Sequence, residues 1–348
     1  MIGAKIISIV PPTAWHALAG HPVLLPYYHM VSDETVPHLR RLYRHKNVAQ
    51  FEADLDYLLA FSKAISLEDL LARVNGNRPL PKRSFLLSFD DGFREMAEIV
   101  APILKRKGVP AIFFVNSAFV DNRELCFHHK IGLLLDQLSS NSNPALTKKL
   151  AGCLKLSDEN LEAVTARLRK ISYAERGILD GLAETCGLSF EKFLAEQKPY
   201  LASEQIRSLL RDGFSIGAHS VDHPFYGDLS LEEQLRQTRD SIRFVQEQFG
   251  VPQKTFAFPH SDAGVPRAFF EKISTDGTIT FGTAGLLPSE RPTHFQRFSM
   301  EKNDGSARQI LARQSARCFY QSFFRRNNAP QTAPVKQAPS APVPSING

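Results

Sequence analysis

The stretch FLLSFDDGF, residues 85–93, joins a short apolar run to two adjacent carboxylates, Asp90 and Asp91. The run is typical of a buried parallel strand, and Asp-Gly at its end favours a turn. Two carboxylates this close repel each other, and burying either without a partner costs several kcal/mol. Two interpretations follow: an ordinary turn with Asp91 as a cap and Gly92 at positive φ, or a site that requires both carboxylates.

Similar apolar runs, rich in aromatic and β-branched residues, recur along the chain. Together with the first they cover 23–31, 84–91, 111–116, 214–220, 255–260, 278–285 and 294–300. Helical segments separate most of them, and this alternation of strand and helix, about seven times, favours a βα barrel over an open sheet. The alternation breaks between about 120 and 200, where the sequence is helical throughout. We expect a helical insertion there, after the third strand.

These patterns predict three parts: a lead-in over 1–22, a barrel domain over 23–328 and a Pro/Ala-rich tail over 329–348. The tail has no aromatic residue, so we expect it to be disordered. The 348 residues carry a net charge of +6, which is mild for this length and does not indicate nucleic-acid binding. The four cysteines are far apart without a CxxC pair, and we expect reduced thiols rather than disulfides.

The segment GAHSVDHP, residues 217–224, places His219 and His223 four apart at the end of a predicted strand. Asp90 and Asp91 also follow a predicted strand, and the carboxyl ends of barrel strands converge on one mouth. Two histidines and one carboxylate with open positions form a site for a divalent metal that activates water. One aspartate would then bind the cation while the other stays free as a base, which favours the functional interpretation of the paired carboxylates.

SFDDGF and HSVDHP together resemble the first two motifs of the polysaccharide deacetylases, metal-dependent enzymes that remove acetyl groups from carbohydrates. PYYHMV and FAFPHSDAG resemble further family segments, and the similarity extends over most of 23–300. The resemblance implies a distorted, incomplete (β/α) barrel and an N- or O-deacetylase acting on an amino-sugar polysaccharide, oligosaccharide or glycolipid. It makes Asp90 the general base and Asp91, His219 and His223 the ligands of a divalent metal, with zinc the first choice and cobalt, nickel or iron open.

The sequence departs from the family at two points. Ala257, Phe258 and Pro259 leave no equivalent of the arginine that orients the base in many members, and no segment matches the late histidine that protonates the leaving amine. His260 and His294 are the two candidates for that acid. The resemblance also implies an oxyanion stabilised by the metal and by a backbone N–H near His260.

Several other residues are assigned to the mouth. We expect His29, Phe258 and Pro259 to contact the substrate, although a core role for His29 is equally compatible with the sequence. His128 and His129 are expected to be structural or to lie on the rim.

Three alternatives remain. A non-haem iron oxygenase also uses two histidines and a carboxylate, but in another order and on a β-sandwich. A relative of the same fold could hydrolyse a non-sugar amide, and a non-catalytic descendant could bind carbohydrate only. Replacing Asp90 separates a catalyst from a binder.

The segment 307–328 interleaves arginines with aromatic residues, a pattern that also occurs in helices lying at a membrane interface. Packing of the aromatic residues on the barrel as a closing helix, with solvated arginines, explains it slightly better. The N-terminal apolar run is short and is ended by Pro11 and Pro12, so we expect no export signal. These features predict a cytoplasmic protein with a peripheral contact at the membrane face.

Overall fold

The computed structural model describes residues 23–76, 79–141, 143–287, 291–301 and 305–327, with side chains up to residue 318 in the last range. The predicted lead-in and tail lie outside these residues. Parallel strands form the main sheet in the order β10-β9-β8-β7-β6-β5-β2-β11. Their bounds are β2 Pro26–Tyr28, β5 Leu87–Phe89, β6 Ala111–Val115, β7 Ser215–Ala218, β8 Thr255–Ala257, β9 Ile279–Gly282, β10 His294–Gln296 and β11 Phe298–Ser299.

The two outer strands of this sheet are consecutive in the chain and are separated only by Arg297. β10 pairs with β9, whereas β11 pairs with β2 at the opposite end of the strand order. One segment, 294–299, therefore joins both ends of the sheet and nearly closes it. The predicted fold, a distorted (β/α) barrel of about seven strands, is confirmed. The main sheet has one strand more than predicted, because the last predicted strand is divided into β10 and β11.

Strand β6 shows why these runs fold as they do. All five of its residues are buried, because a parallel strand is covered on both faces and cannot alternate between apolar and polar residues. A smaller parallel sheet beside the barrel contains β1 Val23–Leu24, β3 Lys63–Ala64 and β4 Ser84–Phe85 in the order β1-β4-β3.

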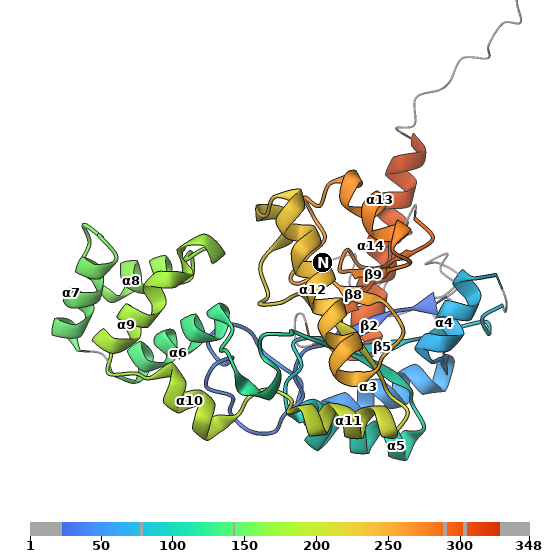
Figure 1. Cartoon of the computed structure of the whole chain (residues 1–348), viewed down its shortest axis with the longest axis horizontal. Coiled ribbons are helices and arrows are strands. Elements are labelled where there is room, and N and C mark those ends of the chain that lie inside the picture. Colours follow the sequence, from blue (N-terminus) through green and yellow to red (C-terminus); the bar gives the residue numbers. More distant parts are fainter. Residues whose placement is uncertain (1–22, 77–78, 142, 288–290, 302–304, 328–348) are drawn as a thin grey trace, which may run out of the picture.

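Helices cover the outside of the barrel (Figure 1). In the described residues they are α3 Val48–Phe61, α4 Leu67–Val74, the π-helical turn η1 Met96–Val100, α5 Ala101–Lys107, α11 Ser203–Arg211, the 3-10 turn η4 Tyr226–Asp228, α12 Leu231–Phe249, α13 Arg267–Thr275 and α14 Ala307–Asn327. Helix α12 has a capping residue at each end. The Ser230 hydroxyl accepts from the Glu233 N–H at 3.2 Å, and Gly250 ends the helix in the left-handed conformation at φ 68°.

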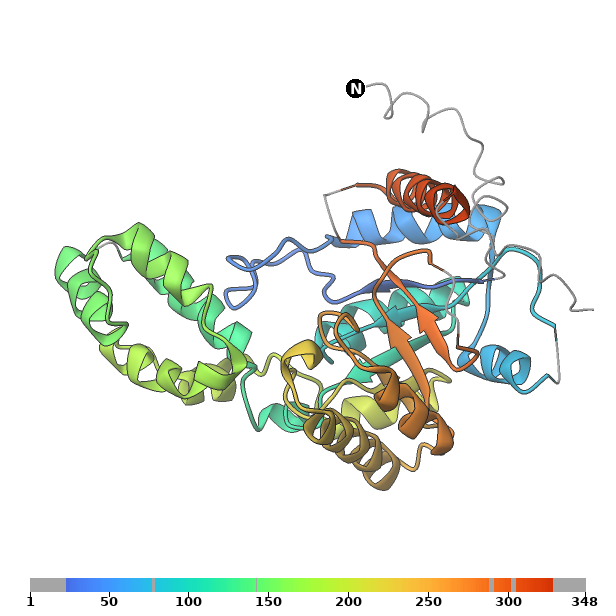
Figure 2. The same ribbon diagram turned by 90° about the horizontal axis from the view of Figure 1, so that it is seen from above.

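The helices between β6 and α11 form a lobe that projects from one side of the barrel in both views (Figures 1 and 2). They are η2 Val120–Asn122, α6 Phe127–Ser140, α7 Pro144–Cys153, α8 Leu161–Leu168, η3 Tyr173–Ile178, α9 Leu179–Thr185 and α10 Phe190–Gln197. Tyr173 of this lobe donates a hydrogen bond to Asp222, in the loop after β7, so the lobe contacts the mouth of the barrel.

The first half of α14 packs on the barrel as a closing helix. Its residues Ile310, Leu311 and Ala312 are buried, and α14 lies against α3. The N–H of Ala307 donates to Asp54 at 2.6 Å, which fixes the start of the helix. No helix among the described residues has the length and apolar character to span a bilayer. The membrane contact proposed for 307–328 stays a prediction, because the aromatic side chains of this segment lie outside the described ones.

Candidate active site

The carboxyl ends of the barrel strands bring the predicted residues together. Asp90 and Asp91 follow β5, His219 follows β7, His29 follows β2, and Glu301 lies just beyond β11. All these strands are parallel, so their ends lie at the same mouth of the barrel. Residues separated by more than two hundred positions in the chain thereby share one site.

Asp91, His219 and His223 form a tight buried group. The Oδ1 atom of Asp91 lies 3.3 Å from Nε2 of His219 and 3.1 Å from Nε2 of His223. The ligand atoms of the three residues lie within 4.8 Å of one another. Burial opposes ionisation of Asp91, but His223, His219 and His29 together outweigh it and hold the pKa of this carboxyl well below its usual value.

Unusual backbone angles aim these side chains. Asp91 has φ of 70° and Gly92 has φ of 64°, so the turn after β5 is left-handed at two successive residues. Ser220 and His223 adopt φ of 70° and 65°. Such angles cost non-glycine residues free energy and are concentrated at functional sites. A Cβ at Gly92 would also approach the Val115 side chain to 3.1 Å, which is a tight contact.

The loop after β7 is held by hydrogen bonds on both sides. The Ser220 hydroxyl accepts from the N–H of His223 at 3.0 Å, and Gln237 of α12 accepts from the N–H of Val221 at 2.9 Å. Asn116, which follows β6, donates to the carbonyl of His219. The two imidazoles are therefore positioned by the strand ends and by α12 together.

The donor set of this group fits a divalent cation. Nδ1 of His219 lies 2.9 Å from the carbonyl of Ala257, which only accepts, so Nδ1 carries a proton. When the ring is neutral, as a metal ligand must be, its Nε2 presents a lone pair toward Asp91. Oδ1 of Asp91 is buried and has no hydrogen-bond donor among the described residues. Lone pairs that face one another repel unless a cation lies between them. Two imidazole nitrogens and a carboxylate are ligands that zinc and related metals accept.

Asp90 does not face the two histidines but is held by Arg297. The guanidinium binds both carboxylate oxygens, Nη1 to Oδ1 at 2.7 Å and Nη2 to Oδ2 at 2.8 Å. Arg297 is 0% exposed and Asp90 is 2% exposed. Burial is the largest single effect on Asp90 and would raise its pKa, but the charge and hydrogen bonds of Arg297, together with His219 and His29, outweigh burial and the pKa is lowered. The carboxylate is thus ionised and fixed in orientation, with lone pairs remaining on both oxygens.

Arg297 is the arginine beside the base for which no equivalent was found in the sequence. It lies at the junction of β10 and β11 rather than in the FAFPHS segment, so no local family motif contains it. Its guanidinium also donates to the Ser88 hydroxyl at 3.1 Å and lies 4.6 Å from the Tyr27 ring centre. A charged residue inside the apolar strand HFQRFSM was the signal that could have identified it, because a buried arginine requires a buried anion.

His29 and Glu301 form a second charged pair at the mouth. Nδ1 of His29 lies 2.5 Å from Oε2 of Glu301, and Oε1 of Glu301 accepts from the backbone N–H groups of His29 and Met30 at 3.0 and 2.9 Å. Burial alone would lower the pKa of His29, but the Glu301 carboxylate outweighs it and raises the pKa to about 9. The imidazole is therefore protonated at neutral pH. Sequence analysis missed Glu301.

A cavity of about 580 Å³ opens over this group. His29, Tyr43, Asp91, His223, His260 and Glu301 are among the residues that line it. The hydroxyl of Tyr43 is buried and has no hydrogen-bond partner among the described residues. Burial raises the pKa of Tyr43 well above its usual value, so the hydroxyl keeps its proton and remains a donor. The cavity lining therefore offers two carboxylates, imidazoles and one phenolic donor.

The two histidines predicted as general acids are placed differently. His260 lies at the cavity, with its ring centre 4.5 Å from that of His223 and 4.7 Å from that of His128. His294 is buried away from the lining, with Nδ1 2.8 Å from the Thr280 hydroxyl and Nε2 3.1 Å from Asp262. Both nitrogens of His294 are engaged, which leaves none to reach a substrate.

Phe258 and Pro259, which we expected to contact the substrate, are buried and are not among the residues that line the cavity. Phe258 packs on Tyr226, with ring centres 5.3 Å apart, and belongs to the hydrophobic core. His128 does line the cavity, as expected for a rim residue. His129 is buried, and its Nδ1 lies 2.6 Å from the Tyr200 hydroxyl.

Solved structures with a similar fold cover most of this chain. IcaB from Ammonifex degensii matches with a TM-score of 0.53 at 16% identity, over 84% of this chain and 97% of its own. The Streptococcus pyogenes deacetylase PplD, solved with acetate, matches with a TM-score of 0.54 at 14% identity and the same coverages. A de-N-acetylase from Aggregatibacter actinomycetemcomitans gives 0.52 at 14%, over 83% and 99%. At these identities the likeness establishes the fold.

The comparison of sequences gives the family. No curated protein matches the chain at a significant level. The family model of the polysaccharide deacetylases matches residues 77–267, which is more than half of the 348 residues and includes Asp90, Asp91, His219 and His223. The chain therefore belongs to the polysaccharide deacetylase family of enzymes.

Proposed function

We propose that this protein is a cation-dependent hydrolase that removes N-linked acetyl groups from an amino-sugar polysaccharide, oligosaccharide or glycolipid. The observation that carries the proposal is that the two adjacent aspartates have different partners. Asp91 faces Nε2 of His219 and His223, whereas Asp90 is held by Arg297 through both carboxylate oxygens. One carboxylate suits a metal ligand and its neighbour suits a base.

Asp91, His219 and His223 would hold the cation, with zinc as our first choice. A divalent cation in such a site supplies Lewis acidity, which lowers the pKa of water and polarises the acyl carbonyl. Asp90 accepts the proton of the attacking water on a lone pair that Arg297 leaves free. Because Arg297 fixes the carboxylate plane, Asp90 needs no reorganisation when the proton arrives.

We assign the general acid to His29 rather than to His260 or His294. His29 lines the cavity and is held in the protonated state by Glu301. Since Nδ1 is bonded to Glu301, Nε2 is left to donate its proton to the departing amine as the carbon–nitrogen bond breaks. His260 has the rings of His223 and His128 beside it, and burial and these rings hold its pKa well below the usual value.

Tyr43 supplies a further donor for the substrate. Its buried hydroxyl lines the same cavity and has no partner among the described residues. A buried donor without a partner costs about 1–3 kcal/mol, and a hydrogen bond to an acyl oxygen or a sugar hydroxyl would offset that cost. We propose that Tyr43 orients the substrate.

The similar proteins support the N-acetyl assignment. One of them is a de-N-acetylase, and PplD is a deacetylase solved with acetate, the product that acetyl hydrolysis releases. Arg297 also weakens the alternative of a non-catalytic carbohydrate binder, because one of the two features that favoured it was a missing arginine beside the base; the other was the unidentified acid. A protein that only bound sugar would have no use for an ionised, oriented Asp90.

Acetate release tests the proposal. The full-length chain, loaded with zinc or cobalt, is incubated with N-acetylated and O-acetylated amino-sugar oligomers, and acetate and free amine are measured. We expect equal amounts of acetate and amine from the N-acetylated oligomers, loss of both with a chelator, and recovery when the cation is restored. Cation-loaded protein that releases acetate from no N-acetylated glycan would contradict the proposal.

A further inference from the structure

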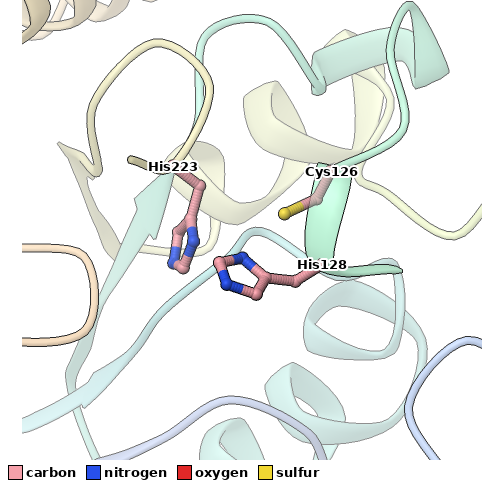
Figure 3. Close-up of side chains that lie close together, drawn as sticks. All are labelled: Cys126, His128 and His223. Atoms are coloured by element: carbon pink, nitrogen blue, oxygen red, sulfur yellow. The ribbon is translucent and has the colours of Figure 1, made fainter. Parts of the chain in front are cut away.

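A second group of metal-ligating side chains lies beside the first. Cys126, His128 and His223 each offer one ligand atom, and these atoms lie within 4.8 Å of one another. Figure 3 shows the Cys126 thiol and the His128 ring, from the start of α6, converging on the His223 ring from the loop after β7. The helical insertion and the barrel loop thus meet at this point.

Two imidazole nitrogens of this group have no hydrogen-bond partner among the described residues. They are Nδ1 of His128 and Nδ1 of His223, and both are buried. Cys126 is a buried free cysteine that also lines the cavity. Two buried polar atoms without partners cost free energy, and one ligand between them would remove both costs.

The chemistry of the donors selects the kind of ligand. A thiolate and two imidazoles suit a borderline or soft divalent cation such as zinc, cobalt or cadmium. The first group, Asp91, His219 and His223, offers one oxygen ligand and no sulfur ligand. The second group, with its thiolate, therefore prefers softer cations than the first. A cation at three protein ligands keeps an open position toward the cavity.

His223 belongs to both groups. Its Nε2 lies 3.1 Å from Asp91, whereas its Nδ1 has no partner, so the ring presents one nitrogen to each group. A neutral imidazole has one lone pair, and binding through both nitrogens requires loss of the remaining proton. A cation at the second group therefore competes for His223 with a cation at the first.

We propose that Cys126, His128 and His223 form a second, inhibitory site for soft divalent cations, which shares His223 with the hydrolytic centre. One equivalent of cation supports hydrolysis. An excess of zinc or cadmium occupies the second site, and His223 is then no longer a ligand of the first site. The inhibition rests on the proposed function, but the site itself does not.

Cobalt absorption tests the site without any assay of activity. Full-length protein is stripped of cations and titrated with Co²⁺, and thiolate-to-cobalt charge-transfer absorption in the near ultraviolet is recorded. We expect this band in the wild type and in the control Cys153→Ser, which removes an exposed thiol elsewhere. We expect its loss in Cys126→Ser and its weakening in His128→Gln. A wild type without the band, or Cys126→Ser with it, would overturn the site.

Zinc inhibition tests the consequence. Excess zinc should inhibit acetate release by the wild type and by Cys153→Ser, and Cys126→Ser should need about tenfold more zinc for the same inhibition, the scale of loss typical for a weakened metal site. Equal sensitivity of Cys126→Ser and the wild type would refute the inhibitory role. The two proposals fail separately: a cobalt–thiolate band without acetate release refutes the proposed function, and acetate release without the band refutes the second site.

Discussion

Replacing Arg297 by methionine removes the cation that holds Asp90 and leaves the rest of the barrel unchanged. Two charge-assisted hydrogen bonds, at 2.7 and 2.8 Å, are lost, and Asp90 stays buried without a partner. Breaking a buried ion pair from one side costs about 3–5 kcal/mol, mostly because the remaining charge is not compensated. We expect the free energy of unfolding of Arg297→Met to fall by about that amount.

The double variant Asp90→Asn, Arg297→Met identifies the cause. It removes both charges, so it should be more stable than Arg297→Met alone, with a coupling energy near the upper end of the range for contacting residues, about 3 kcal/mol. The control Arg267→Met removes an exposed arginine that pairs with Glu271 on α13, and should change stability by less than about 1 kcal/mol.

The contribution of Asp90 to stability should depend on pH with opposite sign in the wild type and in Arg297→Met. In the wild type the pKa of Asp90 is lowered, so its contribution is present above about pH 4, its unfolded value, and is lost as the pH falls through the folded pKa. In Arg297→Met burial is the largest effect that remains on Asp90, and burial raises the pKa. The folded state then prefers the protonated acid, and the deficit of the variant shrinks as the pH falls.

Urea unfolding between pH 4 and pH 8 measures these quantities for the wild type, both Arg297 variants and Arg267→Met. The reasoning is refuted if Arg297→Met unfolds like the wild type at pH 8, or if removing Asp90 as well makes it still less stable.

Three further predictions concern the mouth and the C-terminal helix. Turnover should fall above about pH 9 as His29 loses its proton, which gives the pH–rate profile an alkaline limb. Glu301→Gln should move this limb to lower pH, and an unmoved limb would exclude His29 as the acid. His219→Ala should weaken cation binding by about a hundredfold or more, since even outer-shell changes cost 10–100-fold, and equilibrium dialysis showing wild-type affinity would refute the ligand assignment. Full-length chain should float with anionic vesicles at low salt and less after Arg325→Glu, Arg326→Glu; equal flotation would exclude an electrostatic anchor there.

The parts of the site that lie next to a strand in sequence could be predicted. Asp90, Asp91, His219 and His223 sit in two short motifs directly after apolar runs, and the convergence of parallel strand ends then brings the motifs together. The seven strands were predictable for the same reason, because buried parallel strands read as continuous apolar runs.

The partners of these residues could not be predicted, because they come from elsewhere in the chain. Arg297 reaches Asp90 across 207 positions, and Glu301 reaches His29 across 272. Each is a single charged residue without a motif, and only the closure of the barrel by β10 and β11 brings it to the mouth. His294 shows the opposite case. Its residue type suits a general acid, but Thr280 and Asp262 occupy both of its ring nitrogens.

Turnover by Asp90→Asn tests the central claim most directly. Asparagine keeps the shape of the side chain but cannot accept the proton of water as a base. The variant should retain about one bound cation and its fold, and should release acetate from an N-acetylated oligomer about a hundredfold more slowly or worse. A cation-loaded Asp90→Asn that releases acetate at nearly the wild-type rate would show that Asp90 is a structural turn residue and not the base.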